Sequence, residues 1–165
     1  MEENIITSLQ NARVKHLMVL QQKSSLRREE GLFVVEGQRE IAHCREAGYE
    51  IDTMFVVEGQ DCPKDLPAVR VSPAVYEKMA YRGSTEGIIA IVKTRPLALQ
   101  DLTLRENPLI VVLESVEKPG NLGAILRSAD AAGVDAVIVC DPLTDLYNPN
   151  LIRSSIGAIL SLIHI

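Results

Sequence analysis

The chain has 165 residues, of which 47% are apolar, 24% are charged and 4% are aromatic, and its net charge is −5. The apolar fraction is too high for a disordered chain, glycine and proline usage is too ordinary for collagen, and no apolar run approaches the roughly 20 residues of a membrane span. The start of the chain, with Glu2 and Glu3, is acidic and does not resemble a signal peptide, so we expect a globular cytoplasmic protein.

The first 95 residues alternate between predicted helices and strands. Apolar periodicity and cap residues predict helices over 14–20, 38–47 and 72–79. Short apolar runs predict strands over 31–35, 54–57 and 88–92, the last of them buried on both faces. Ser72 and Pro73 form a strong helix start, because serine caps the helix and proline fits its first turn. Such alternation predicts an α/β layer structure.

The basic residues of this first part lie close together in the sequence. Residues 11–28 contain no acidic side chain, and their basic residues are Arg13, Lys15, Lys23, Arg27 and Arg28. Because screening limits the reach of distant charges to about 10 Å, such a stripe can neutralise several phosphates on a chain that is acidic overall. A solvated helix face explains the same pattern, and charge alone favours that explanation.

Residues 96–108 interrupt the alternation and predict a linker between a first domain, 1–95, and a second domain that starts at residue 109. Strands are predicted over 109–113 and 136–140, with a helix over 121–132 between them and another helix that opens near Asn150. This βαβ unit predicts the start of a parallel sheet. A sheet of two strands cannot cover itself, so we expect the second domain, 109–159, to be incomplete.

The last six residues, 160–165, read LSLIHI, which is one reading frame of a transposon end used in sequencing libraries. We therefore hypothesise a non-native tail and assign no functional role to His164. The other two histidines show no metal-ligand spacing with it, and the three cysteines form no C-x-x-C pair. We expect no metal and no disulfide framework, only buried, reduced thiols.

Two segments of the second domain are candidates for chemistry. Residues 117–127 lie at a strand-to-helix turn, where ligands bind in open α/β sheets, and residues 147–158 form an Asn-Pro turn before a helix rich in small residues. The first segment matches neither the G-x-G-x-x-G pattern nor a P-loop, so a nucleotide-binding oxidoreductase is poorly supported. The second has serines but no histidine or paired acid, which argues against a hydrolase. Ordinary turn and packing architecture explains each segment when it is taken alone.

Taken together, the two segments resemble the first two motifs of the SpoU (TrmH) family of RNA ribose 2′-O-methyltransferases, in the SPOUT class. The matching residues are Pro119-Gly120-Asn121-Leu122-Gly123-Ala124-Ile125-x-Arg127, then Asn148-Pro149, then Arg153-x-Ser155-x-Gly157-Ala158. The front of the chain resembles the substrate-binding domain of that family, which is ribosomal-protein-like, in Asn11-x-x-x-Lys15, Arg27-Arg28 and Phe33-Val34-Val35-Glu36-Gly37. The resemblance spans most of the chain.

The resemblance implies an enzyme that transfers a methyl group from S-adenosylmethionine, held in a deep trefoil knot, to a ribose 2′-hydroxyl of rRNA or tRNA. It implies that Arg127 activates this hydroxyl, with Asn121 and Ser155 arranging the site, and that the protein pairs as a homodimer. Arg153 then supplies a further phosphate contact. We expect the basic residues Arg13, Lys15, Arg27 and Arg28 to contact RNA phosphates.

This sequence departs from the family in one large respect and one small one. The family's third motif, a late segment that threads the knot and ends in a serine-leucine-asparagine run, is absent, so no cofactor-binding residue is assigned here. We therefore expect a C-terminally truncated and inactive fragment that binds S-adenosylmethionine poorly. Lys118 stands where many relatives carry an acid. The alternative is a non-catalytic RNA-binding module formed by the front domain.

Overall fold

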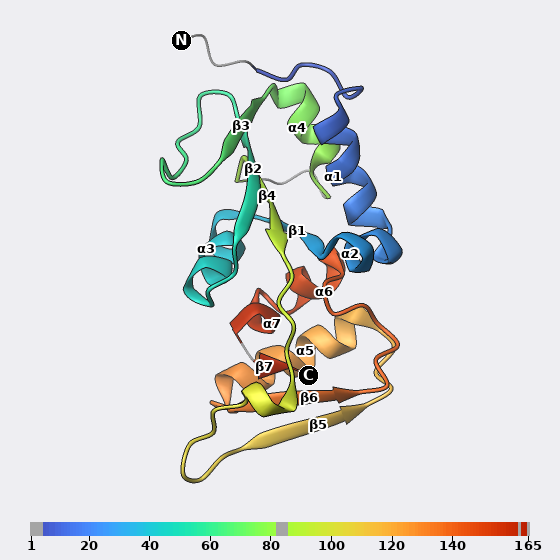
Figure 1. The fold of residues 1–165 in the computed structure, drawn as a ribbon, viewed down its shortest axis with the longest axis vertical. Coiled ribbons are helices and arrows are strands. Elements are labelled where there is room, and N and C mark those ends of the chain that lie inside the picture. The colour runs from blue at the N-terminus through green and yellow to red at the C-terminus, as the bar shows by residue number, and fades with distance from the viewer. Residues whose placement is uncertain (1–4, 82–85, 162, 165) are drawn as a thin grey trace. The chain divides into compact units, whose positions relative to one another are not determined.

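The computed structural model describes residues 5–81, 86–161, 163 and 164, shown in Figure 1. The chain divides into two compact units, Met1–Thr94 and Arg95–Ile165. The division falls one residue before the predicted end of the first domain, and the predicted linker is part of the second unit. Both units mix helices with sheets, as the predicted α/β fold class requires.

The first unit contains one mixed four-stranded sheet, in the order β1-β4-β2-β3. Its strands are β1 (Leu32–Glu36), β2 (Ile51–Val57), β3 (Ala68–Val71) and β4 (Ile88–Lys93). The central strand β4 runs antiparallel to β1 and β2, whereas β2 and β3 are parallel. Every residue of β4 except Lys93 is buried, which confirms the prediction that this strand is covered on both faces.

The helices of the first unit are α1 (Ala12–Gln22), α2 (Ser24–Glu30), α3 (Gln38–Glu46) and α4 (Pro73–Met79). Helix α4 begins where Ser72 and Pro73 predict it, and the Ser72 side chain accepts a hydrogen bond from the amide of Val75 at 3.4 Å. Helix α1 has a similar cap, because the side chain of Asn11 accepts from the amide of Arg13 at 2.9 Å. Helix α2 was not predicted.

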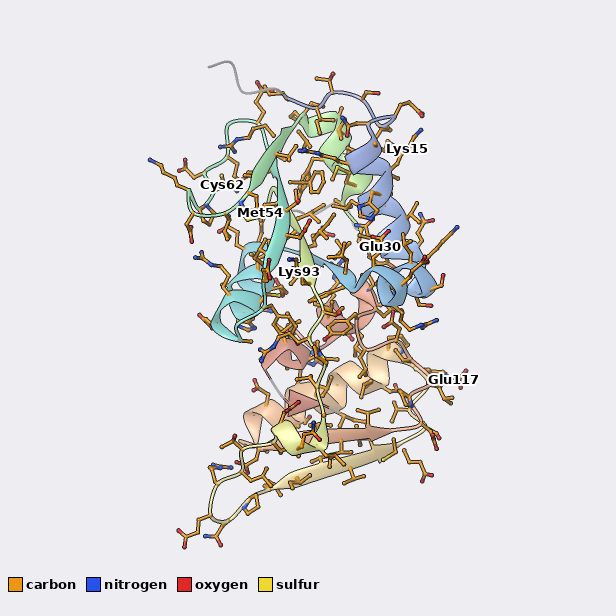
Figure 2. All side chains as sticks on the ribbon, in the orientation of Figure 1. Lys15, Glu30, Met54, Cys62, Lys93 and Glu117 are labelled. Carbon is orange, nitrogen blue, oxygen red and sulfur yellow. The ribbon has the colours of Figure 1, made fainter. Side chains whose placement is uncertain are left out.

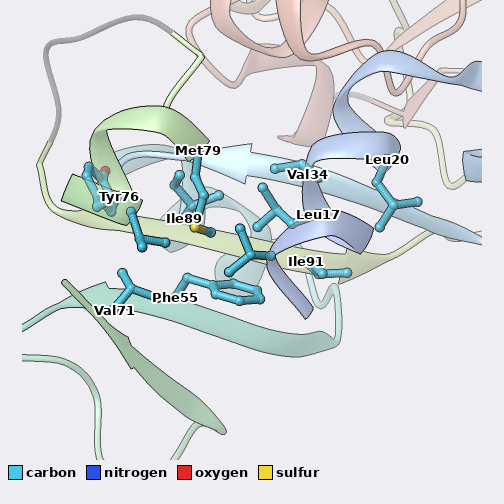
Figure 3. Packing of buried hydrophobic residues seen from close by; sticks show 11 residues of the cluster. Leu17, Leu20, Val34, Phe55, Val71, Tyr76, Met79, Ile89 and Ile91 are labelled. Atoms are coloured by element: carbon cyan, nitrogen blue, oxygen red, sulfur yellow. The ribbon is translucent and has the colours of Figure 1, made fainter. Parts of the chain in front are cut away.

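Helices α1 and α4 pack against one face of this sheet and form its core (Figure 3). The buried cluster consists of Val14, Leu17, Leu20, Val34, Phe55, Val71, Val75, Tyr76, Met79, Ile89 and Ile91. Burying each large apolar side chain of this kind contributes about 1.5–3 kcal/mol, so the cluster fixes where α1 lies over the sheet. The exposed face of α1 therefore has a defined position relative to β2 and β3.

The second unit contains a parallel three-stranded sheet, in the order β5-β6-β7. Its strands are β5 (Ile110–Glu114), β6 (Ala136–Cys140) and β7 (Ile163–His164), and its helices are η1 (Leu99–Asp101), α5 (Pro119–Ala131), α6 (Pro149–Ser154) and α7 (Ala158–Ser161). The βαβ prediction is confirmed, but the prediction of only two strands is wrong. The third strand comes from residues of the hypothesised tail, whose origin stays a hypothesis.

The cysteines are free but differ in their exposure. Cys44 is fully buried, and burial raises the pKa of its thiol to about 12. Cys62 is half-buried and Cys140 is exposed, so the prediction of three buried thiols is wrong for these two. Among the described residues, no helix has the length and apolar character needed to span a membrane.

Candidate functional site

The turn after β5 leads directly into α5, which carries two of the three predicted catalytic residues. Pro119 occupies the first turn of α5, where a missing amide proton is harmless, and the amides of Asn121 and Leu122 donate to the Lys118 carbonyl at 3.0 and 3.1 Å. The first turn contains no acidic side chain. The positive end of the helix dipole therefore faces Asn121 without an internal counter-charge.

One face of α5 is buried and the other carries the candidate side chains. Leu122, Gly123 and Leu126 are buried, whereas Asn121 and Arg127 are exposed. Arg127 lies one turn beyond Gly123 on a neighbouring strip of the helix surface. Within the described part of the chain, the Arg127 guanidinium has no ion pair, so it is available to an anionic ligand.

Helix α6 packs so closely on α5 that the contact needs a glycine. A Cβ atom added at Gly123 would lie 2.7 Å from Ser154 Cβ and 2.8 Å from the Ser154 carbonyl carbon, closer than real Cβ atoms approach. The Ser154 hydroxyl donates to the carbonyls of Pro119, at 3.1 Å, and Leu151, at 3.2 Å. This contact fixes α6 against the start of α5.

A second hydroxyl holds the same turn from the loop after β6. Thr144 is buried, and its hydroxyl donates to the carbonyl of Glu117, the residue labelled at the edge of the second unit in Figure 2. Thr144 and Ser154 thus bind backbone carbonyls on both sides of Lys118. Neither role was predicted, although Ser154 belongs to the segment 147–158 that is rich in small residues.

Ser155, the third predicted catalytic residue, lies inside the second unit. Its side chain is fully buried, and its hydroxyl donates to the carbonyl of Ile152 at 2.9 Å and accepts from the amide of Ile159 at 3.4 Å. This pattern joins the end of α6 to the start of α7. The implied role of Ser155 in arranging the site stays a prediction, and the structure shows that its side chain would act from inside the unit. Arg153, two residues earlier, is exposed and has no ion pair among the described residues.

The carboxyl ends of β5 and β6 meet at one edge of the sheet, where ligands of parallel sheets bind. Glu114 and Cys140, the last residues of these strands, are register partners, and both are exposed. Ser115 and Asp141, which follow them, have left-handed backbone conformations, with φ of 53° and 45°. Non-glycine residues in this conformation are uncommon and concentrate at functional sites, so this edge is part of the candidate site.

The predicted phosphate contacts of the first unit separate into three exposed residues and one buried one. Arg13, Lys15 and Arg28 are exposed, and Figure 2 labels Lys15 on α1. Arg27 is only 3% exposed, and its guanidinium donates to the carbonyls of Leu20, at 2.5 Å, and Gln21, at 3.1 Å. Arg27 therefore closes the last turn of α1, and the prediction that it contacts RNA is wrong.

Comparison with family models divides the chain in the same way as its fold. Residues 11–90 match the MRM3-like substrate binding domain, and residues 108–164 match the SpoU rRNA Methylase family. Both candidate segments of the second unit, with Asn121, Arg127 and Arg153, lie inside the second match.

Curated relatives match nearly the whole chain. A 23S rRNA (uridine(2479)-2′-O)-methyltransferase of Streptomyces viridochromogenes is 29% identical over 95% of this chain and 58% of its own length. A 23S rRNA (guanosine(2553)-2′-O)-methyltransferase of Bacillus subtilis is 27% identical over 93% of this chain and 61% of its own length. The chain thus spans about three-fifths of the length of these two relatives.

Solved structures give the same result for the fold. A crystal structure of an RNA 2′-O ribose methyltransferase is 40% identical to this chain, with a TM-score of 0.82, and the match covers 96% of this chain and 64% of that one. The SpoU methyltransferase AviRb from Streptomyces viridochromogenes, crystallised with AdoMet, is 27% identical with a TM-score of 0.83, over 94% of this chain and 61% of that one.

Proposed function

Because the chain belongs to the SpoU rRNA methylase family, we propose that it is the substrate-binding and catalytic-helix part of an RNA methyltransferase that modifies a ribose 2′-hydroxyl of rRNA. The family resemblance of the two motifs is thereby confirmed. The observation that carries the proposal is Arg127, an exposed guanidinium without an ion pair among the described residues, on a helix whose start is fixed by Ser154 and Thr144. The two curated relatives described above are 23S rRNA 2′-O-methyltransferases.

Arg127 acts on the hydroxyl by charge and not by removing its proton. A guanidinium stays protonated in proteins, so it does not serve as a base. It instead holds the phosphate next to the target ribose in line and stabilises the negative charge that develops on the attacking oxygen as the hydroxyl proton passes to solvent. Asn121 sits at the positive end of α5 and orients the same nucleotide, and Arg153 contacts a neighbouring phosphate.

S-adenosylmethionine, when bound, supplies the methyl group. The residues present fit a ligand at this edge of the sheet in two respects. The strand ends at Glu114 and Cys140 are exposed, and a Cβ added at Gly120 would have nothing within 4 Å, so the start of α5 is open. The contribution of this chain is to hold the RNA, align its hydroxyl and carry the positive charge that the reaction needs.

The decisive experiment measures transfer of tritiated methyl groups from S-adenosylmethionine to ribosomal RNA by the longest product of the gene that contains this chain. Arg127→Ala is expected to lower the rate about a hundredfold, the typical loss when one charge-stabilising donor is removed. Lys64→Ala, which removes an exposed charge from the other unit, is the control and should leave the rate unchanged. Undiminished transfer by Arg127→Ala would exclude this role.

RNA binding with no methyl transfer under any condition would instead support the non-catalytic RNA-binding module.

We propose rRNA and not tRNA as the substrate, since the relatives that name a modified nucleotide act on 23S rRNA. A homodimer and a cytoplasmic location complete the proposal. The first follows from the family resemblance, and the second from the bacterial origin of the two relatives described above. Sedimentation of the purified protein tests the dimer directly.

A further inference from the structure

The first unit has a hollow beside α1 that its predicted phosphate contacts do not explain. The hollow has a volume of about 370 Å³, and it lies between the start of α1 and the adjoining ends of β2 and β3. Its accessible apolar lining comes from Pro67, Ala68 and Val69, whereas Phe55 and Ile91 lie beneath it in the core that α1 covers, as Figure 3 shows. Its rim is polar, so the hollow combines a surface for a flat apolar group with hydrogen-bonding groups around it.

Arg13 joins this hollow to a second one. The neighbouring hollow, of about 430 Å³, shares Arg13, Ala68 and Val69 with the first. The Arg13 side chain is exposed and forms no ion pair within the described ranges, whereas its backbone amide is used to cap α1. A guanidinium between two hollows is placed to hold the phosphate that links two nucleotides.

The lining of the first hollow also includes a carboxylate. Asp52 is exposed on β2, and its Oδ2 accepts a hydrogen bond from the hydroxyl of Thr53 at 3.0 Å. A carboxylate only accepts hydrogen bonds, so a base that binds it must present N–H donors. Guanine presents two adjacent donors, N1–H and N2–H, on its Watson–Crick edge, whereas adenine, cytosine and uracil each place an acceptor next to a donor.

We propose that this hollow binds an unpaired guanosine of the substrate RNA, with its base over Ala68 and Val69, its Watson–Crick edge on Asp52 and its phosphate on Arg13. The proposal rests on the proposed function only in taking RNA as the partner. Proteins that recognise RNA sequence bind unstacked bases in this way, by contact with the base face and hydrogen bonds to its edge. Asp52 is thus a specificity-determining residue, distant in sequence from the catalytic motifs.

The test measures binding of the 165-residue chain to fluorescent oligouridylates that carry one central guanosine, inosine or adenosine. Inosine lacks only the N2 amino group, so it removes one of the two donors without changing the shape of the ring. We expect guanosine to bind about tenfold more tightly than adenosine, the discrimination typical of one bidentate contact, with inosine between them. Asp52→Asn should abolish this preference while leaving the affinity for the adenosine oligonucleotide unchanged.

Two further variants separate base from phosphate contacts. Arg13→Ala should weaken binding of all three oligonucleotides alike, and Lys78→Ala, which removes an exposed charge from α4, is its matched control. Equal binding of guanosine and inosine, or a guanosine preference that survives Asp52→Asn, would overturn the proposal. A chain that binds none of the oligonucleotides overturns it as well. A retained guanosine preference without methyl transfer contradicts only the proposed function.

Discussion

The contact between α5 and α6 allows a quantitative test, because two glycines of the same helix differ in their surroundings. Gly123→Ala places a Cβ 2.7 Å from Ser154 Cβ and 2.8 Å from its carbonyl carbon, whereas Gly120→Ala places one in open space. Alanine is favoured over glycine in a helix by up to about 1 kcal/mol, and this gain applies to both variants. Only Gly123→Ala also forces the two helices apart.

The cost of that separation follows from two contributions. Overpacking a close contact costs about 1–3 kcal/mol, and the hydrogen bond from Ser154 to the Pro119 carbonyl contributes about 1 kcal/mol that a displaced α6 loses. After the helix gain is subtracted, Gly123→Ala should be destabilised by about 1–3 kcal/mol. Gly120→Ala should be unchanged or slightly stabilised.

Urea unfolding followed by circular dichroism measures this difference, with the midpoint compared at constant slope. For a domain of 60–100 residues, 1 kcal/mol corresponds to about 4–8 °C in Tm, so thermal unfolding is an independent check. If Gly123→Ala is as stable as Gly120→Ala, the two helices are not packed as described, and the positioning of Arg127 by α6 loses its support.

Three further predictions concern side chains outside this contact. Arg27→Met should destabilise the chain by about 2–3 kcal/mol in urea unfolding, because two carbonyls of α1 lose charged donors, whereas Arg28→Ala on the exposed side should have no measurable effect. The Arg105 guanidinium and the Leu109 amide lower the pKa of Asp135 to about 2. The stability they provide is complete above the unfolded pKa near 4 and is lost as pH falls through 2, so Asp135→Asn should lower Tm at pH 7 and lose its effect near pH 2. Iodoacetamide at pH 8 should modify Cys140 and leave Cys44 intact until the chain unfolds, as peptide mass mapping would show.

The elements that sequence predicted well are those whose signals are local. Ser72 and Pro73 specify the start of α4 by themselves, because a cap and a fixed φ act within one turn. The apolar run of β4 specifies a central strand for the same reason. Strand β3 has only four residues and was missed, since it exists through parallel pairing with β2, a contact between distant parts of the chain.

Helix α2 was missed for a related reason. Its sequence SSLRREE contains a single large apolar residue, Leu26, so it shows no helical apolar period. The helix is held by Gly31, which ends it with a left-handed φ of 64°, and by Arg27, which reaches back to the last turn of α1. The second of these contacts connects two elements, and a pattern within either element does not contain it.

In the candidate site, too, local sequence patterns predict some residue positions and not others. The position of Arg127 on the open side of α5 follows from helical spacing, because the buried face is marked by Leu122 and Leu126. The roles of Ser154 and Ser155 do not follow from spacing. Both are serines at the end of α6. Ser154 lies against α5, whereas Ser155 lies inside the unit. Only the packing of α5 on α6 decides between them.

The burial of Arg27 also changes what the basic stripe can do. The sequence gives residues 11–28 five basic side chains. One of them, Arg27, donates its hydrogen bonds to carbonyls of α1 and does not reach an RNA phosphate. For single-stranded RNA, each phosphate contact contributes about 0.7 to the slope of log affinity against log salt. Substituting Arg13 or Arg28 should therefore reduce the slope by about that amount. Substituting Arg27 should reduce stability and leave the slope unchanged, because an RNA footprint depends on which charges reach the surface and not on how many the sequence contains.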